Sequence, residues 1–253
     1  MPSRERSAAV PGAGSVDPAD HPPLPLPDAD WDWLRERCAA LGLPDPAPWR
    51  ETLAALYGHL VGVNRWLNLT TVTSPRDWLK WHVLDSWSGL RAAALRAVQS
   101  GALAVDLGSG GGYPGLPLAL ALPHLRWLLI DARRKKAEFL GAAARLLGPW
   151  VGARHLRGDC VPHAAPELHR ACQLVVNRAM GPADAVLPQA APLLAEGGLL
   201  VVWKGPAFLG SERDRAAGVA PRWGFRVADV TGLRLEDGDP ERYLVTYRRV
   251  GGR

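Results

Sequence analysis

Between residues 31 and 97, apolar residues recur at the spacing of amphipathic helices. Residues 31–43 form a short amphipathic pattern, and residues 49–67 form a longer one whose apolar positions lie three or four apart. Those positions are Trp49, Leu53, Leu56, Leu60, Val63 and Leu67. A Ser-Pro pair at residues 74–75 is typical of the first turn of a third helix. The pattern predicts a small N-terminal helical subdomain over residues 31–97.

From residue 102 onward, short apolar runs alternate with helical stretches, as a parallel sheet covered on both faces requires. Five such runs predict strands at residues 102–107, 126–131, 153–157, 172–177 and 199–204. Two further runs, residues 224–230 and 242–249, have only a turn-rich loop between them, which predicts an antiparallel hairpin. The sequence therefore predicts an α/β domain over residues 98–253, with a parallel sheet that ends in a hairpin.

The first 30 residues are rich in Pro, Gly, Ala and Asp, which leaves little to bury and disfavours helix. We expect residues 1–30 to form a disordered tail. No apolar run approaches the roughly 20 residues that cross a bilayer, and the N-terminus lacks the apolar stretch of a signal peptide. We therefore expect a cytoplasmic protein that does not enter a membrane.

Composition adds limits on the chemistry. The chain has 253 residues, of which 47% are hydrophobic, so a sizeable core is possible. Its three cysteines, Cys38, Cys160 and Cys172, form neither a CxxC pair nor a metal-ligand pattern, so we expect buried thiols and no metal. The net charge of +5 agrees with a nucleic-acid partner, although many proteins without one are equally basic.

The most informative local motif is the glycine-rich segment 106–115, which follows a predicted strand. Glycines let the backbone turn sharply and approach a ligand closely. The GxGxxG string at residues 110–115 is by itself weak evidence for a dinucleotide. Asp106 precedes the first glycine, where its charge would repel a diphosphate but could accept hydrogen bonds or face a cationic group. The loop therefore favours a ligand other than a dinucleotide.

A second carboxylate, Asp131, ends the next predicted strand, where it could accept both hydroxyl groups of a ribose. Asp159 follows the third predicted strand and could meet an adenine amino group. Each of these aspartates could instead be an ordinary turn residue. The order of carboxylate, glycine loop and carboxylate resembles the S-adenosylmethionine site of class I methyltransferases, whose cofactor carries sulfonium and ammonium cations. That resemblance implies a Rossmann-like sheet.

Two sequence motifs that the chain lacks limit the possible methyl acceptors. Enzymes that methylate amino groups of bases usually have a Pro-Pro-aromatic segment after the fourth strand, where this chain has Asn-Arg-Ala-Met at residues 177–180. C5-pyrimidine enzymes need a thiolate nucleophile in a Pro-Cys or Thr-Cys context, which none of the cysteines has. An acceptor with a free lone pair, such as guanine N7, needs only positioning and desolvation.

Six segments, in order, resemble the RsmG family, also called glucose-inhibited division protein B. They are residues 68–70, 82–86, 106–117, 131–140, 177–179 and 204–205, within a resemblance that covers about residues 31–248. This family methylates guanine N7 in small-subunit ribosomal RNA. The resemblance therefore implies S-adenosylmethionine as cofactor and 16S rRNA or the small ribosomal subunit as partner. The chain departs from the family pattern at four positions: Trp81 replaces Arg, Gly111 replaces Pro, Tyr113 replaces Leu or Phe, and Asn177 replaces Ser.

The resemblance also implies site residues. Gly108 and Tyr113 would line the cofactor, Gly158 and Asp159 would lie near its adenine, and Arg178 would face the reaction centre. With the two strand-end carboxylates and the glycine loop, the candidate cofactor-binding residues are Asp106, Gly108, Gly110, Tyr113, Asp131, Gly158, Asp159 and Arg178. Arg178 is also the candidate catalytic residue.

Basic residues supply candidate RNA contacts. Arg133, Arg134 and Lys135, with Lys136, form a cluster beside the expected cofactor site, and Lys204 could hold a phosphate as a point charge. Such a charge run is more often a solvated surface.

The sequence thus predicts direct in-line attack of guanine N7 on the methyl group. Two alternatives stay open, a methyltransferase of this fold that acts on a small molecule or a protein side chain, and an RNA-binding module without catalysis. His82 and Asp85 lie three apart on one helical face, where they could shape the substrate pocket or form a structural hydrogen bond. The sequence does not determine the oligomeric state, and we expect a monomer.

Overall fold

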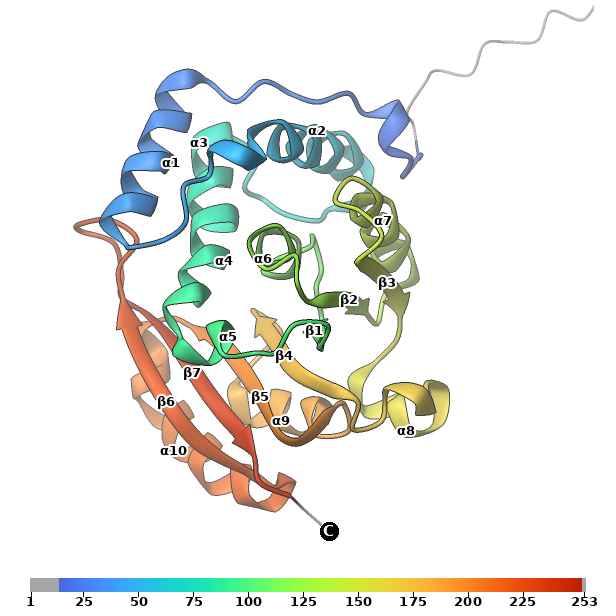
Figure 1. The fold of residues 1–253 in the computed structure, drawn as a ribbon, viewed down its shortest axis with the longest axis vertical. Helices are drawn as coiled ribbons and strands as arrows, with labels where there is room; N and C mark the ends of the chain where they lie inside the picture. Colours follow the sequence, from blue (N-terminus) through green and yellow to red (C-terminus); the bar gives the residue numbers. More distant parts are fainter. Residues whose placement is uncertain (1–13, 252–253) are drawn as a thin grey trace, which may run out of the picture.

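A seven-stranded sheet lies at the centre of the computed structural model, which describes residues 14–251 (Figure 1). The strand order is β3-β2-β1-β4-β5-β7-β6, in which β7 runs antiparallel to both of its neighbours and the other pairs are parallel. The strands are β1 (Leu103–Leu107), β2 (Arg126–Asp131), β3 (Val151–His155), β4 (Cys172–Arg178), β5 (Leu194–Lys204), β6 (Phe225–Leu233) and β7 (Arg242–Arg249). The predicted Rossmann-like sheet with a terminal hairpin is confirmed.

Helices cover both faces of this sheet (Figure 1). The α-helices are α1 (Asp28–Ala40), α2 (Arg50–Leu67), α3 (Pro75–Trp78), α4 (Asp85–Trp87), α5 (Ala93–Arg96), α6 (Gly115–Ala121), α7 (Arg134–Arg145), α8 (Val161–Ala164), α9 (Ala183–Ala190) and α10 (Ser211–Val219). The 3-10 turns are η1 (Pro18–Asp20), η2 (Ala47–Trp49), η4 (Ser88–Arg91), η5 (Gly158–Cys160), η6 (Pro166–Leu168), η7 (Pro206–Leu209) and η8 (Ala220–Trp223). A π-helical turn, η3 (Leu79–Leu84), joins α3 to α4.

Two hydrophobic cores lie on opposite faces of the sheet because successive strand residues point to opposite sides. In β1, Ala104 belongs to one core and Val105 to the other. The first core also contains α1, α2 and the buried Trp78 and Trp87, so the N-terminal helices pack on the same face as α6 and α7. The division of the chain at residue 97 stays a prediction, since the N-terminal helices and the sheet share this core.

The predicted third helix begins as expected but does not stay a regular α-helix. Ser74 accepts a hydrogen bond from the Asp77 backbone N–H at 3.3 Å, and Pro75 occupies the first turn. The π-helical turn η3 then widens the helix between residues 79 and 84. Such turns often lie at functional sites, and this one carries His82.

The expected disordered tail covered residues 1–30, of which residues 1–13 lie outside the described part of the chain. For residues 14–30 the prediction does not hold. The Leu24 N–H donates to the Ala54 carbonyl at 3.1 Å, Leu26 is buried, and α1 already begins at Asp28. Prolines leave few N–H groups to satisfy in this segment, so its short apolar side chains pack against α2 at little polar cost.

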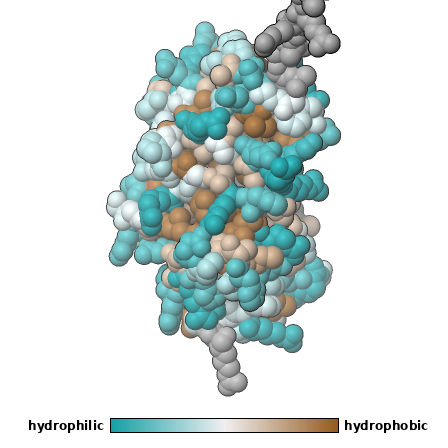
Figure 2. All heavy atoms as spheres, turned by 90° about the vertical axis from the view of Figure 1, so that its right-hand side faces the viewer, coloured by the Kyte–Doolittle hydropathy of each residue, from teal (hydrophilic) through white to brown (hydrophobic). Residues whose placement is uncertain are grey.

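Other expectations from composition have mixed outcomes. Cys38 and Cys172 are buried thiols, as predicted, whereas Cys160 is exposed. Within residues 14–251, no helix combines the length and the apolar character that a membrane crossing needs. The face on the side of α7 and β3 is largely hydrophilic, and apolar residues reach the surface near its middle (Figure 2).

Two glycines on α2 allow the N-terminal segment to approach closely. A Cβ at Gly58 would overlap the Pro22 carbonyl oxygen and would lie 2.9 Å from the Leu24 nitrogen, so the backbone would have to move. A Cβ at Gly62 would overlap the His21 ring. Residues 21–24 can therefore pack directly against α2 because Gly58 and Gly62 have no side chains.

We expect Gly58→Ala to lower the free energy of unfolding by about 1–3 kcal/mol, because the added methyl group overpacks a backbone contact. The matched control is Gly141→Ala in α7, where the new Cβ would be 4.0 Å from its nearest neighbour. That control should raise stability by up to about 1 kcal/mol through helix propensity. Urea denaturation measures both, and equal gains in the two variants would contradict the close packing.

Candidate functional site

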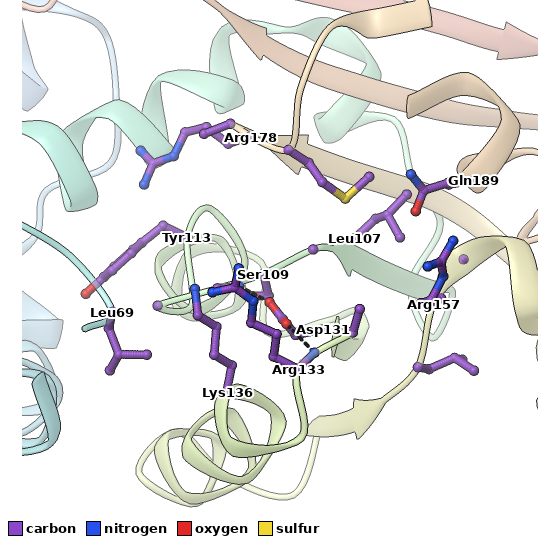
Figure 3. Close-up of a pocket in the computed structure, with 18 of the residues that line it drawn as sticks. Leu69, Leu107, Ser109, Tyr113, Asp131, Arg133, Lys136, Arg157, Arg178 and Gln189 are labelled. Atoms are coloured by element: carbon purple, nitrogen blue, oxygen red, sulfur yellow. Dashed lines mark hydrogen bonds between the residues drawn. The ribbon is translucent and has the colours of Figure 1, made fainter. Parts of the chain in front are cut away.

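A cleft of about 490 Å³ opens at the carboxyl ends of β1, β2 and β4 (Figure 3). Open parallel sheets bind ligands at this edge. In Figure 3, Arg157 and Gln189 lie at one end of the cleft, and Leu69 and Tyr113 lie at the other. The segments that form it are distant in sequence, so the fold assembles the site.

Asp106 does not line this cleft, in contrast to its prediction as a cofactor-binding residue, although it accepts hydrogen bonds, which was one of its two predicted roles. It is fully buried, and its Oδ2 accepts hydrogen bonds from the Ser109 hydroxyl at 2.5 Å and the Gly115 N–H at 2.9 Å. A Cβ at Gly115 would lie 2.6 Å from that oxygen, so the contact requires glycine. Asp106 therefore holds the glycine loop closed from beneath. Burial raises its pKa to about 6.

Gly108 and Gly110 line the cleft, as predicted, with φ angles of 71° and 60°. These left-handed conformations favour glycine. A Cβ at Gly108 would also overlap the Met180 side chain, which lines the cleft too. The loop can therefore present bare backbone to a ligand.

Asp131 ends β2 in the wall of the cleft and is almost buried. Its Oδ2 accepts from the Gly110 N–H at 3.0 Å and its Oδ1 accepts from the Arg133 N–H at 2.8 Å. This carboxylate ties the glycine loop to the end of the neighbouring strand. Since a carboxylate has about four acceptor sites, it retains capacity for a ligand's hydroxyl groups.

Gly158 and Asp159, which were both predicted to lie near the adenine, have different positions relative to the cleft. Gly158 lines the cavity, and a Cβ there would overlap the Gln189 carbonyl oxygen. Asp159 is exposed, does not line the cavity, and pairs with Arg157 at 2.6 Å. The Arg157 hydrogen bond lowers the pKa of Asp159. Arg157 itself lines the cleft, so the ion pair lies at its rim.

Arg178 ends β4 and lines the cleft, while its guanidinium is held by the N-terminal helices. Nη1 donates to Asp85 Oδ2 at 2.6 Å and to the Trp81 carbonyl at 2.8 Å, and Nη2 lies 3.2 Å from His82 Nδ1. His82 and Asp85 thus share Arg178 and do not form the direct contact that their spacing allowed. This buried ion pair joins the helical segment to the sheet.

Tyr113 lies beneath Arg178 at the same end of the cleft (Figure 3). Its ring stacks on the His82 ring at a centroid distance of 4.2 Å, and the Arg178 guanidinium carbon lies 5.6 Å from its centroid. Its hydroxyl accepts from the Trp78 indole N–H at 2.6 Å. Tyr113 is therefore a rigid wall of the cleft, and burial raises its pKa.

His82 is neutral in this environment, because burial, and then the adjacent Arg178, lower its pKa to about 3. Its Nδ1 accepts from Arg178, so its Nε2–H donates to the Thr70 hydroxyl at 2.8 Å. Both ring nitrogens are thereby engaged. The imidazole links the loop after α2 to the end of β4.

Three of the predicted RNA-binding residues, Arg133, Arg134 and Lys135, lie in different environments. Arg133 lines the cleft, together with Lys136 of the same cluster. Arg134 pairs with Glu138 on the exposed side of α7 at 3.4 Å, and the Lys135 ammonium lies 5.9 Å from the Trp66 ring.

Lys204 differs from the expected phosphate contact. Its side chain is 9% exposed, and its Nζ lies 2.7 Å from Glu212 and 2.6 Å from the Gly181 carbonyl oxygen. Glu212 therefore neutralises the charge of Lys204 within the fold. This partner lies eight residues further along the chain, and the local sequence pattern does not reveal it.

The departures from the family pattern have defined places. Asn177 is buried and donates to the Leu107 carbonyl at 2.7 Å, which joins β4 to the end of β1. Gly111 lines the cleft beside Tyr113. Trp81 lies outside the cavity lining, with Lys80 and Arg242 within 4.8 and 5.2 Å of its ring.

The predicted set omits several residues that line the cleft, among them Thr70, Arg157 and Met180. It also omits Asn64, which lies outside the lining and supports it. The Asn64 side chain accepts from the Leu69 and Thr70 N–H groups at 2.6 and 3.0 Å and donates to the Thr70 carbonyl at 2.9 Å. It thereby fixes the loop that carries Leu69 and Thr70 into the cleft wall. An asparagine in the last turn of α2, four residues before the Asn-Leu-Thr segment, was the available signal. Across residues 14–251, no three His, Cys, Asp or Glu side chains gather as a metal site.

Known proteins resemble the chain over most of its length. A family model described as GidB, rRNA small subunit methyltransferase G, matches residues 50–214. The protein named ribosomal RNA small subunit methyltransferase G from Sorangium cellulosum is 36% identical over 195 residues, which cover 75% of this chain and 80% of the relative. Its namesake from Geobacter sulfurreducens is 36% identical, with coverages of 84% and 94%, and that from Synechococcus elongatus is 33% identical, with coverages of 86% and 88%.

The buried Asp106 predicts a pH dependence of stability. Between its ordinary pKa of 3.8 and about 6, the folded protein holds a proton that the unfolded chain has released. Raising the pH through this window therefore lowers the free energy of unfolding. We expect the wild-type protein to lose on the order of 3 kcal/mol relative to Asp106→Asn between about pH 4 and about pH 7.

Urea denaturation of both proteins across this range measures the difference, in which the contributions of other groups cancel. Parallel stability curves for the two proteins would show that Asp106 does not titrate as its burial requires.

Proposed function

The chain belongs to the GidB family of rRNA small subunit methyltransferase G proteins, and from this premise we propose that it methylates N7 of a guanine in 16S rRNA. The family, the enzyme class and S-adenosylmethionine as cofactor were predicted from the sequence and are confirmed. Guanine as the base and N7 as the atom are the proposal. When bound, S-adenosylmethionine supplies an electrophilic methyl group.

The observation that carries the choice of N7 is that, among the described residues, every histidine and carboxylate that lines the cleft already has hydrogen-bond partners within the protein. Both nitrogens of His82 are engaged, and both oxygens of Asp131 already accept backbone N–H groups. Asp106 lies beneath the loop, outside the cavity lining. An acceptor that must lose a proton would need a general base within hydrogen-bond reach. Guanine N7 has an in-plane lone pair and needs none.

The cleft fits the proposed cofactor. Gly108 and Gly110 line it in left-handed conformations that favour glycine, so their backbone faces the ligand without a side chain. Asp131 is placed to accept hydrogen bonds from ribose hydroxyl groups. Gly158 and Tyr113 form opposite parts of the wall, and the adenine contact of Asp159 stays a prediction. Arg178 lies with Tyr113 at the end where we place the methyl acceptor. Of the predicted cofactor-binding residues, Asp106 and Asp159 lie outside the cavity lining.

We propose that RNA approaches over the cluster of Arg133, Arg134, Lys135 and Lys136. Arg133 and Lys136 have no ion pair among the described residues, so their charges are available to phosphate. Lys204 is left out because Glu212 neutralises it. We further propose that the protein acts as a monomer in the cytoplasm, where its ribosomal substrate is found.

The proposal predicts the labelled product. Purified protein, methyl-labelled S-adenosylmethionine and small ribosomal subunits that lack the modification are incubated, and the digested RNA is separated into nucleosides. We expect label in 7-methylguanosine. Label in another nucleoside would overturn the choice of N7, and label in protein or in no product would favour the alternatives of a different acceptor or a non-catalytic binder.

Removing the two cleft-side charges should change the salt dependence of RNA binding. For Arg133→Ala with Lys136→Ala, we expect the slope of log K against log salt to become shallower by roughly 1.5–2, because two fewer counterions are released. The matched control is Arg222→Ala with Arg226→Ala, which removes two exposed charges, one in η8 and one on β6. Filter-binding titrations measure the slopes, and equal slopes in the two double variants would place RNA elsewhere.

A further inference from the structure

Arg178 presents only part of its hydrogen-bonding capacity to the cleft. A guanidinium has five N–H donors. Three of them are directed at Asp85, the Trp81 carbonyl and His82, all within one turn of the helical segment. Over the described part of the chain, the Nε–H and the second Nη2–H have no acceptor, while the side chain lines the cleft. The held donors therefore decide where the free ones point.

Asp85 is the strongest of these holding contacts. Its side chain is 4% exposed, and its 2.6 Å contact with Arg178 is charge-assisted. Its backbone is fixed as well, because the Trp203 indole N–H donates to the Asp85 carbonyl at 2.8 Å. The π-helical turn η3 ends immediately before this residue. The carboxylate is thus built into the site from two elements.

The arrangement is not one that stability alone explains. Asp85 Oδ1 lies 3.6 Å from Arg242 Nε, and neither atom has a hydrogen bond in the described residues. Burying an acid between two arginines with one oxygen unsatisfied has a large desolvation cost. Well-packed apolar residues in place of such a group usually give the folded protein equal or greater stability. A role at the reaction centre accounts for the retained charge.

We propose that Asp85 is a positioning residue, which with His82 fixes the plane of Arg178 so that its two free N–H groups face the methyl acceptor. This inference rests on the proposed function. Two donors suit a carbonyl oxygen such as guanine O6, which adjoins N7, whereas adenine has an amino group there. Asp85 also offsets the charge of Arg178 near a base that becomes cationic when N7 is methylated.

The test is a double-mutant cycle on the single-turnover rate of methyl transfer to small ribosomal subunits. We expect Asp85→Asn to slow this rate by about 100-fold through misplacement of Arg178. In an Arg178→Ala background, Asp85→Asn should cause no further loss, because its effect passes through that side chain. Additive losses, or an unchanged rate in Asp85→Asn alone, would overturn the proposal.

Asp239→Asn is the matched control. It removes a partly buried carboxylate, 2.7 Å from Lys80, that holds the same π-helical turn without touching Arg178. It should retain the wild-type rate while losing comparable thermal stability. If it slows the reaction as much as Asp85→Asn does, the effect is general loosening of the turn and positioning is refuted.

A second readout does not depend on activity. In ¹⁵N NMR spectra, the Arg178 guanidinium resonances, identified by their loss in Arg178→Ala, should show hindered rotation in the wild-type protein and in Asp239→Asn. They should show free rotation in Asp85→Asn. Hindered rotation in Asp85→Asn would overturn the proposal, whether or not the wild-type protein forms 7-methylguanosine. A wild-type protein that forms no 7-methylguanosine would instead refute the proposed function.

Discussion

The carboxylate of Asp106, buried beneath the loop that it closes, is the contact on which the site depends. One oxygen binds both Ser109 and Gly115, so the chain must turn back over the end of β1 before α6 can begin. That turn forces left-handed backbone at Gly108 and Gly110 and brings the Gly110 N–H to Asp131 on the neighbouring strand. The empty space above β1, β2 and β4 is a consequence, because the loop that would fill it is held down.

The sheet supplies only half of the cleft, and the N-terminal helices supply the rest. Tyr113 of the glycine loop stacks on His82 of η3, and Arg178 of β4 pairs with Asp85. These contacts cross between segments about 30 and 95 residues apart in the chain, where the loss of chain entropy is offset only because the surrounding core is already packed. The shape of the end of the cleft beside Arg178 and Tyr113 is therefore a tertiary property.

Sequence reasoning identified the strands, the glycine loop and the strand-end residues Asp131 and Arg178, because periodicity and turn chemistry are local signals. It did not establish side-chain direction. Asp106 turns inward, although its position before the loop is as predicted. Lys204 is neutralised by Glu212, a partner set by how α10 packs. The ordered segment from residue 14 depends on the bare glycine face of α2, which composition alone does not reveal. Local patterns thus located the site, whereas its hydrogen bonds required the fold.

The groups around Arg178 are arranged to hold its guanidinium without repelling it. His82 is kept neutral by burial and by Arg178, so it can accept a hydrogen bond from that guanidinium without repelling it. Asp85 lies between two arginines, Arg178 and Arg242. Under the proposed function, Arg178 is an oriented donor to the methyl acceptor, and Asp85 offsets part of its charge. A reaction that makes the base cationic benefits from donors at an adjacent oxygen only if the donor's own charge is offset. In the proposed reaction no proton is removed from the acceptor, so the groups at this end of the cleft serve to orient the base and to balance its charge, as attack by a ring nitrogen requires.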